Sequence, residues 1–219
     1  MRSYAHAIYR AQSMMPRLLP GSMHSLPVRD GVAVTIDDGP AGPDISPLLA
    51  VCAELELTCT WFLSGSQVRR NPRAAEEIAD AGHEIGSHGY RHRSVIGLSD
   101  AALREDVRRA GEAIEDATGL RPVLYRPPYG RILPRQLSLL RGLGLHTVLW
   151  SQLPGDWDER IPAHVLHSRL GSVAGGDIVV LHDREGGRRS LAVLLRALHR
   201  VLRTKNLRTY PLLQFTGAQ

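Results

Sequence analysis

The residues with the clearest chemical potential are two adjacent aspartates, Asp37 and Asp38, and two histidines further along the chain, His88 and His92. One carboxylate and two imidazoles form the protein ligand set of many catalytic zinc sites, which keep one position open for water. A second aspartate beside such a ligand could take a proton from that water. The combination predicts metal-assisted hydrolysis with a divalent cation as cofactor.

The chain around these residues must bring their side chains into one cavity. Neighbouring residues of a regular strand point to opposite faces, so the two aspartates can share a site only where the strand ends. Gly39 and Pro40 follow the pair directly and favour a turn there. A solvated turn is the alternative for the pair taken alone. The two histidines stand four residues apart, which would place them on one face of a helical turn.

Short apolar runs alternate with helical patterns along the rest of the chain, which predicts repeated βα units around a parallel sheet or barrel. Asn71 and Ser99 are predicted to cap two of the helices at their N-termini. The predicted strands cover residues 32–36, 58–63, 84–87, 123–125, 146–150, 177–181 and 208–213.

The residues that could do chemistry all follow predicted strands. Because the carboxyl ends of barrel strands meet at one face, these segments are expected to form one active site. The segments are Asp37-Asp38, His88, Arg126-Pro-Pro-Tyr-Gly130, Asp156-Trp157 and His182-Asp183.

Length and composition limit the function classes. The 219 residues suit an N-terminal extension, residues 1–30, followed by one catalytic domain, residues 31–219. The net charge of +5 is spread over helices without a basic block interleaved with aromatics, so nucleic-acid binding is not predicted. Cys52 and Cys59 are expected to be buried thiols. The sequence does not predict an oligomeric state.

No apolar run is long enough to span a membrane, and the first thirty residues lack the apolar segment of a signal peptide. The chain as given is therefore expected to be cytoplasmic. If an export signal has been trimmed from it, the expected location is extracellular or periplasmic.

Taken in order, the five segments resemble the signature of the polysaccharide deacetylase family, also called the NodB-homology domain or carbohydrate esterase family 4. The resemblance runs from about Val32 to the last strand. It implies a distorted (β/α) barrel of about seven parallel strands, which agrees with the strands predicted above. It also implies that Asp38, His88 and His92 bind the metal. Zinc suits this ligand set best, and cobalt, nickel or manganese remain alternatives.

The resemblance further implies four catalytic residues. Asp37 would be the general base, and Arg126 would pair with it and keep it ionised. His182 would protonate the departing amine, because an amide nitrogen is too poor a leaving group to depart as an anion. Asp156 would lie near His182 and favour its protonated form.

Three further residues are implied to bind the substrate. Tyr129 would donate its backbone N–H to the oxyanion. Trp157 and Val180 would form the walls of a small apolar pocket for the acetyl methyl group. The chain departs from the family pattern at Gly89, Arg93, Leu153 and Val180.

The predicted reaction is removal of N-acetyl groups from N-acetylated sugars of a glycan, oligosaccharide or glycolipid, with release of acetate. Two alternatives remain open. One is an O-acetyl esterase acting on a polysaccharide such as acetylxylan. The other is a non-catalytic glycan-binding protein of the same fold, which the altered histidine segment and Leu153 suggest.

Overall fold

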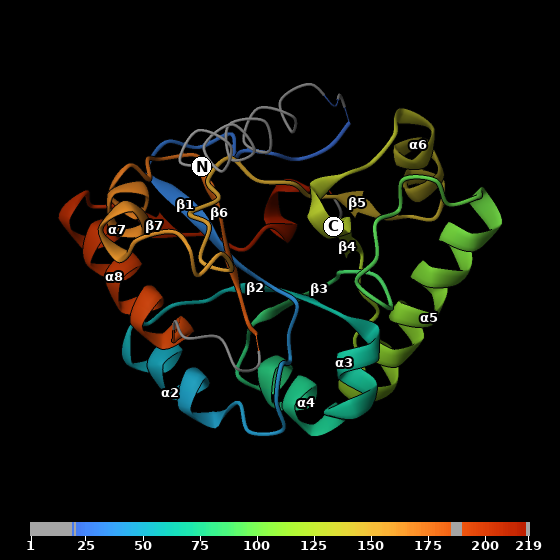
Figure 1. The fold of residues 1–219 in the computed structure, drawn as a ribbon, viewed down its shortest axis with the longest axis horizontal. Helices are drawn as coiled ribbons and strands as arrows, with labels where there is room; N and C mark the ends of the chain where they lie inside the picture. Colours follow the sequence, from blue (N-terminus) through green and yellow to red (C-terminus); the bar gives the residue numbers. More distant parts are fainter. Residues whose placement is uncertain (1–18, 20, 185–189, 218–219) are drawn as a thin grey trace.

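A computed structural model of the chain describes residues 19, 21–184 and 190–217. Its strands form one parallel sheet, and helices form an arc around the outer side of that sheet (Figure 1). The strands are β1 (Gly31–Asp37), β2 (Thr60–Leu63), β3 (Glu84–Ser87), β4 (Leu124–Tyr125), β5 (His146–Thr147), β6 (Ile178–His182) and β7 (Arg208–Thr209). The helices are α2 (Ser46–Glu54), α3 (Gly65–Arg70), α4 (Pro72–Asp80), α5 (Asp100–Thr118), α6 (Pro134–Gly142), α7 (Ala163–Gly171) and α8 (Leu191–Thr204), with 3₁₀ turns at Pro128–Gly130 and Leu213–Phe215.

The sheet is a distorted barrel, as predicted. Its order is β5-β4-β3-β2-β1-β6, with β7 paired to β1, and every strand pair is parallel. A single parallel bridge between Gln152 and Val179 joins the segment after β5 to β6. The two ends of the sheet are thus connected by an irregular segment, not by a regular strand pair.

All seven predicted strands are present, but two are much shorter than expected. After Thr147 the chain continues through isolated bridges, the first between Val148 and Met23. The last strand ends before Pro211, which has no backbone N–H for a ladder. The next two backbone N–H groups, of Leu212 and Leu213, donate to the Glu84 carboxylate instead.

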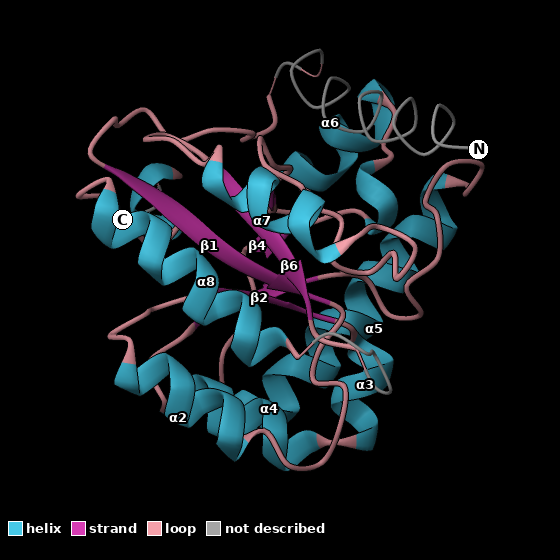
Figure 2. Cartoon of the chain, turned by 60° about the vertical axis from the view of Figure 1, so that its left-hand side comes forward, coloured by secondary structure: helices cyan, strands magenta, loops and turns pink. Residues whose placement is uncertain are grey.

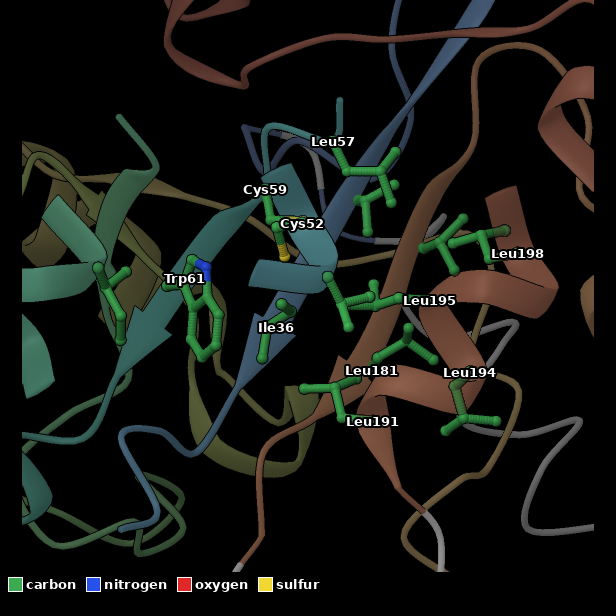
Figure 3. Close-up of a cluster of buried hydrophobic side chains, with 14 of the residues drawn as sticks. Ile36, Cys52, Leu57, Cys59, Trp61, Leu181, Leu191, Leu194, Leu195 and Leu198 are labelled. Carbon is green, nitrogen blue, oxygen red and sulfur yellow. The ribbon is translucent and has the colours of Figure 1, made fainter. Parts of the chain in front are cut away.

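The two faces of the sheet have different roles. Along β1, Val32, Val34 and Ile36 point outward into the main core, whereas alternate residues point inward. Figure 3 shows Ile36 and Leu181 facing the leucines of α8 in this outer core. Figure 2 shows α8 lying alongside β1. The predicted buried thiols, Cys52 of α2 and Cys59, belong to the same cluster.

One of the two predicted helix caps is confirmed. The Ser99 side chain accepts a hydrogen bond from the backbone N–H of Ala102 at the start of α5. Asn71 precedes α4, but its side chain does not cap that helix and donates to the carbonyl of Pro40 instead, at 3.2 Å. The loop after the aspartate pair is therefore tied to the junction of α3 and α4.

Most of the predicted N-terminal extension lies outside the described residues. Within its described part, Met23 and Ser25 form bridges to Val148 and Asp177, so this stretch lies against the barrel. Among the described helices, none has both the length and the apolar character needed to cross a membrane.

Candidate active site

The aspartate pair lies where β1 ends, and the end of the strand turns both carboxylates into one cavity. Asp37 is paired in register with His182 of β6, so these two inward-facing residues are neighbours across the sheet. Asp38 has a φ of 76°, in the left-handed region. Aspartate tolerates this conformation better than most residues, and such backbones cluster at functional sites. Both aspartates line the same cavity, of about 190 Å³.

Asp38, His88 and His92 form a compact group of potential metal ligands. Their ligand atoms all lie within 4.8 Å of one another. Asp38 Oδ1 is 3.0 Å from His92 Nε2 and 3.6 Å from His88 Nε2. This oxygen is buried without a hydrogen-bond partner among the described residues. An orphaned carboxylate oxygen facing two ring nitrogens fits a divalent cation.

A hydrogen bond orients His88 for this role. Its Nδ1 lies 2.7 Å from the carbonyl oxygen of Arg126. Since a carbonyl can only accept, Nδ1 must carry the proton, which leaves the Nε2 lone pair directed toward Asp38. The expected helical turn is absent: the 88–92 segment is a loop, with φ of 75° at Gly89 and 48° at His92. The loop still brings both rings together, with centroids 5.0 Å apart.

Asp37 is held in its charged form by a buried arginine. Arg126 is fully buried, and its Nη1 donates to Asp37 Oδ1 at 2.6 Å and to Thr35 Oγ1 at 2.7 Å. The guanidinium also lies 4.0 Å above the Phe62 ring. Burial alone would raise the pKa of Asp37, but the Arg126 charge and hydrogen bond, helped by nearby histidines, lower it overall. Asp37 is therefore a carboxylate at neutral pH.

His182, by contrast, is held in its protonated, positively charged form. Asp156 contacts it twice, with Oδ1 3.0 Å from the ring Nδ1 and Oδ2 accepting the His182 backbone N–H at 2.8 Å. Burial alone would lower the pKa of His182, but Asp156, with smaller contributions from Asp37 and Asp38, raises it to about 9. The ring also packs against Trp157, at 4.9 Å between centroids.

The cavity walls agree with the predicted substrate-binding residues at two positions and differ at the third. Tyr129 and Trp157 line the cavity. Tyr129 adopts a left-handed φ of 63° and packs its ring 4.8 Å from that of His92. Val180 does not line the cavity, because it lies one step below His182 on the inward face of β6, in the inner core. Trp150 and Leu153 form the apolar wall beside Trp157.

Leu153, one of the departures from the family pattern, lies in the wall of the cavity. It occupies the position where the family pattern has an aspartate, and it is only 3% exposed at the cavity wall. The substitution replaces a potential charge with apolar surface at this point of the cavity. Position 153 is recognisable from the sequence as a departure from the family pattern, but the sequence does not indicate that it faces the cavity.

Sequence reasoning missed Asp106, which supports the histidine loop. This nearly buried residue of α5 accepts the Tyr90 backbone N–H at 3.0 Å, and its other oxygen lies 3.6 Å from Arg93 Nε. A Cβ at Gly89 would lie only 2.9 Å from the Asp106 carboxylate. Two departures from the family pattern, Gly89 and Arg93, thus accommodate one buried carboxylate. The available signal was a charged residue next to the apolar stripe of α5.

Replacing Asp106 with alanine is expected to loosen the loop that carries His88 and His92. The change leaves the Tyr90 N–H without its acceptor, so unfolding free energy should fall by about 1–3 kcal/mol, and zinc affinity should fall about tenfold. Thermal unfolding of the metal-free protein and zinc titration with a competing chelator measure the two effects. Asp116→Ala on the same helix is the matched control, because it removes only an exposed pair with Arg69. Equal zinc affinity in both variants would contradict this role.

The fold and the site together define a parallel (β/α) barrel with an Asp-His-His group of potential metal ligands at the carboxyl ends of its strands. The family model for polysaccharide deacetylases matches residues 27–148. The chain belongs to the polysaccharide deacetylase family. It is 32% identical over 170 residues to a peptidoglycan-N-acetylglucosamine deacetylase of Bacillus cereus, covering 76% of this chain and 79% of the relative.

Solved structures of this family superimpose well on the chain. A family 4 carbohydrate esterase from Streptomyces lividans, in complex with acetate, matches with a TM-score of 0.77 and 26% identity, covering 87% of this chain and 96% of the other. A family 4 pseudoenzyme from Bacillus anthracis matches with a TM-score of 0.73 and 25% identity, covering 87% and 66%. The family fold thus occurs both in an esterase and in a protein described as a pseudoenzyme, so the fold alone does not establish catalysis.

Proposed function

We propose that this protein is a metal-dependent deacetylase that removes N-acetyl groups from N-acetylated sugars of a glycan, oligosaccharide or glycolipid. One observation carries the proposal: a single cavity holds an ionised carboxylate and a protonated imidazole beside the metal-ligand group. Arg126 keeps Asp37 charged, and Asp156 keeps His182 protonated. Two titratable groups whose surroundings drive their pKa values apart are the pattern of a base and an acid.

These residues divide the hydrolysis of an amide between them. A divalent ion held by Asp38, His88 and His92 would supply Lewis acidity and lower the pKa of water. Asp37 accepts the proton of the attacking water, and Arg126 prevents its carboxylate from turning away. The backbone N–H of Tyr129 donates to the carbonyl oxygen as negative charge develops there. His182 then donates its Nε2 proton to the departing nitrogen, since its Nδ1 is engaged with Asp156.

The apolar wall matches the acetyl group that is transferred to water. Trp150, Leu153 and Trp157 are all close to the acid and base, and they offer a surface for the acetyl methyl. A small pocket of this kind favours acetyl over longer acyl groups, since each additional methylene would need space between these side chains.

The experiment that tests the proposal measures acetate release. Protein purified without chelator is analysed for metal and incubated with N-acetylglucosamine oligomers, peptidoglycan and lipid-linked N-acetylated sugars. Release of acetate together with a free amine is expected from at least one of them. Metal-loaded protein that releases none from the whole panel would overturn the proposal and favour the glycan-binding alternative.

The ester alternative remains a second candidate, supported by the likeness to a carbohydrate esterase. The raised pKa of His182 keeps this acid protonated at neutral pH, which favours amide hydrolysis. An ester has a better leaving group and needs the acid less. Acetylxylan in the same assay tests this alternative directly.

The pH dependence should follow the Asp156–His182 pair. His182 must be protonated to act as the acid, so activity should persist below its pKa of about 9 and decline as the pH rises through that value. In Asp156→Asn the anion that raises this pKa is gone, and the alkaline limb should move down by on the order of one to two pH units. Profiles of kcat for both proteins measure the shift. An unchanged alkaline limb would show that His182 is not the acid.

A further inference from the structure

A second cavity adjoins the metal-ligand group. It has a volume of about 320 Å³ and shares Asp38, His92 and Arg184 with the first cavity. A substrate held with its acetyl group beside Trp157 would therefore extend into it. Its lining residues are Asp38, Ser64, Ser66, Gln67, Arg70, Arg91, His92, Asp183 and Arg184.

The charges around this second cavity favour an anion. It is lined by three arginines and two aspartates, and one of those aspartates, Asp38, would be engaged by a bound cation. Arg91 makes no ion pair or hydrogen bond within the described part of the chain, and Arg70 makes only one long bond, 3.4 Å, to Gln67. Arg184 lies 4.0 Å from Asp38, at the limit of an ion pair. These guanidinium groups therefore have N–H donors that are available to a ligand.

A serine hydroxyl lies among these arginines. Ser64, at the end of β2, is only 2% exposed, yet it lines the cavity. Its side chain does not cap α3 and has no hydrogen-bond partner among the residues the structure describes. The hydroxyl oxygen is not one of the buried polar atoms that lack a partner, so it is open to the cavity and can donate to a ligand there. A hydroxyl donor next to guanidinium groups is a typical environment for carboxylate or phosphate oxygens.

We propose that the second cavity binds an anionic oxygen group, a carboxylate or a phosphate, carried by the same substrate whose N-acetyl group is removed. The inference rests on the proposed function and narrows its substrate class to acidic N-acetylated sugars. Arginine suits this role because its planar fork matches carboxylate and phosphate geometry. The anion would bind close to the acetamido group, since the two cavities share the lining residues Asp38 and His92.

The test compares charged substrates with neutral counterparts that carry the same N-acetylated sugar. N-acetylmuramic acid methyl glycoside is paired with its neutral methyl ester for the carboxylate arm. N-acetylglucosamine 1-phosphate is paired with the neutral methyl glycoside of N-acetylglucosamine for the phosphate arm. The double variant Arg70→Gln/Arg91→Gln is compared with Arg200→Gln/Arg203→Gln, which removes the same charge from exposed positions of α8. Binding to metal-loaded protein is measured by calorimetry, and kcat/KM by acetate release.

The native protein is expected to prefer the charged member of at least one pair by about tenfold, and the arm that shows it identifies the anion. Arg70→Gln/Arg91→Gln should abolish that preference and the α8 control should keep it. Raising the salt concentration should also weaken it. Equal binding of charged and neutral members by the native protein would overturn the inference, as would a preference that survives in Arg70→Gln/Arg91→Gln. Binding decides the question even without acetate release, a result that would count against the proposed function alone.

Discussion

Asp37→Asn is expected to reduce acetate release by about 10³-fold while the protein keeps its metal. The side chain has nearly the same shape but cannot take a proton from water. The neighbouring Asp38→Asn should fail for a different reason, because it removes the negative charge from the ligand group and so lowers metal affinity. Acetate release and metal content, measured on both variants, separate the two roles.

The Asp37→Asn substitution is also expected to lower the stability of the folded protein. Arg126 is fully buried, and Asp37 is its carboxylate partner, so an amide at position 37 leaves an uncompensated guanidinium inside the barrel. Breaking a buried ion pair in this way costs about 3–5 kcal/mol, although the remaining bonds of Arg126 to Thr35 and to backbone carbonyls reduce the loss. Thermal unfolding checks that the variant is folded at the assay temperature. A folded, metal-loaded variant with full activity would show that Asp37 is not the base.

Much of the barrel and the set of polar residues at its carboxyl end could be predicted from the sequence. Both follow from local patterns: apolar runs mark strands, and residues that follow parallel strands share one edge. Asp37 and His182 were each predicted to follow a strand, and the β1–β6 register places them side by side as the final residues of those strands. The strand-end rule cannot give the conformations beyond that point, such as the left-handed backbone of Asp38 and His92.

The cavity walls could not be predicted because they depend on packing between segments distant in sequence. Val180 has the right strand and the right face for an acetyl pocket, but it lies too deep in the inner core. Leu153 lies in an irregular segment whose position is set by the bridge between Gln152 and β6. Asp106 contacts the histidine loop through the packing of α5, which a helical pattern alone does not orient.

His182→Ala is expected to separate amide from ester hydrolysis. Loss of a positioned general acid should lower kcat for an N-acetylated sugar by about 10²–10⁴-fold. An O-acetylated sugar should lose far less, because an alcohol oxygen can depart with less help from an acid. Rates on matched N-acetyl and O-acetyl sugars, measured for the native protein and the variant, give the ratio directly. His164→Ala, at an exposed position of α7, controls for the loss of an imidazole elsewhere.

The structure indicates that His182→Ala changes little in the site apart from the proton donor. Asp156 retains one of its two contacts with residue 182 in the variant, since the backbone N–H of that residue still donates to Oδ2. The metal-ligand group does not include His182, so metal content should be unchanged. A loss confined to the amide would therefore report the missing proton donor. Equal losses on amide and ester would instead mean that His182 positions the substrate or supports the cavity, and the ester alternative would then regain its standing.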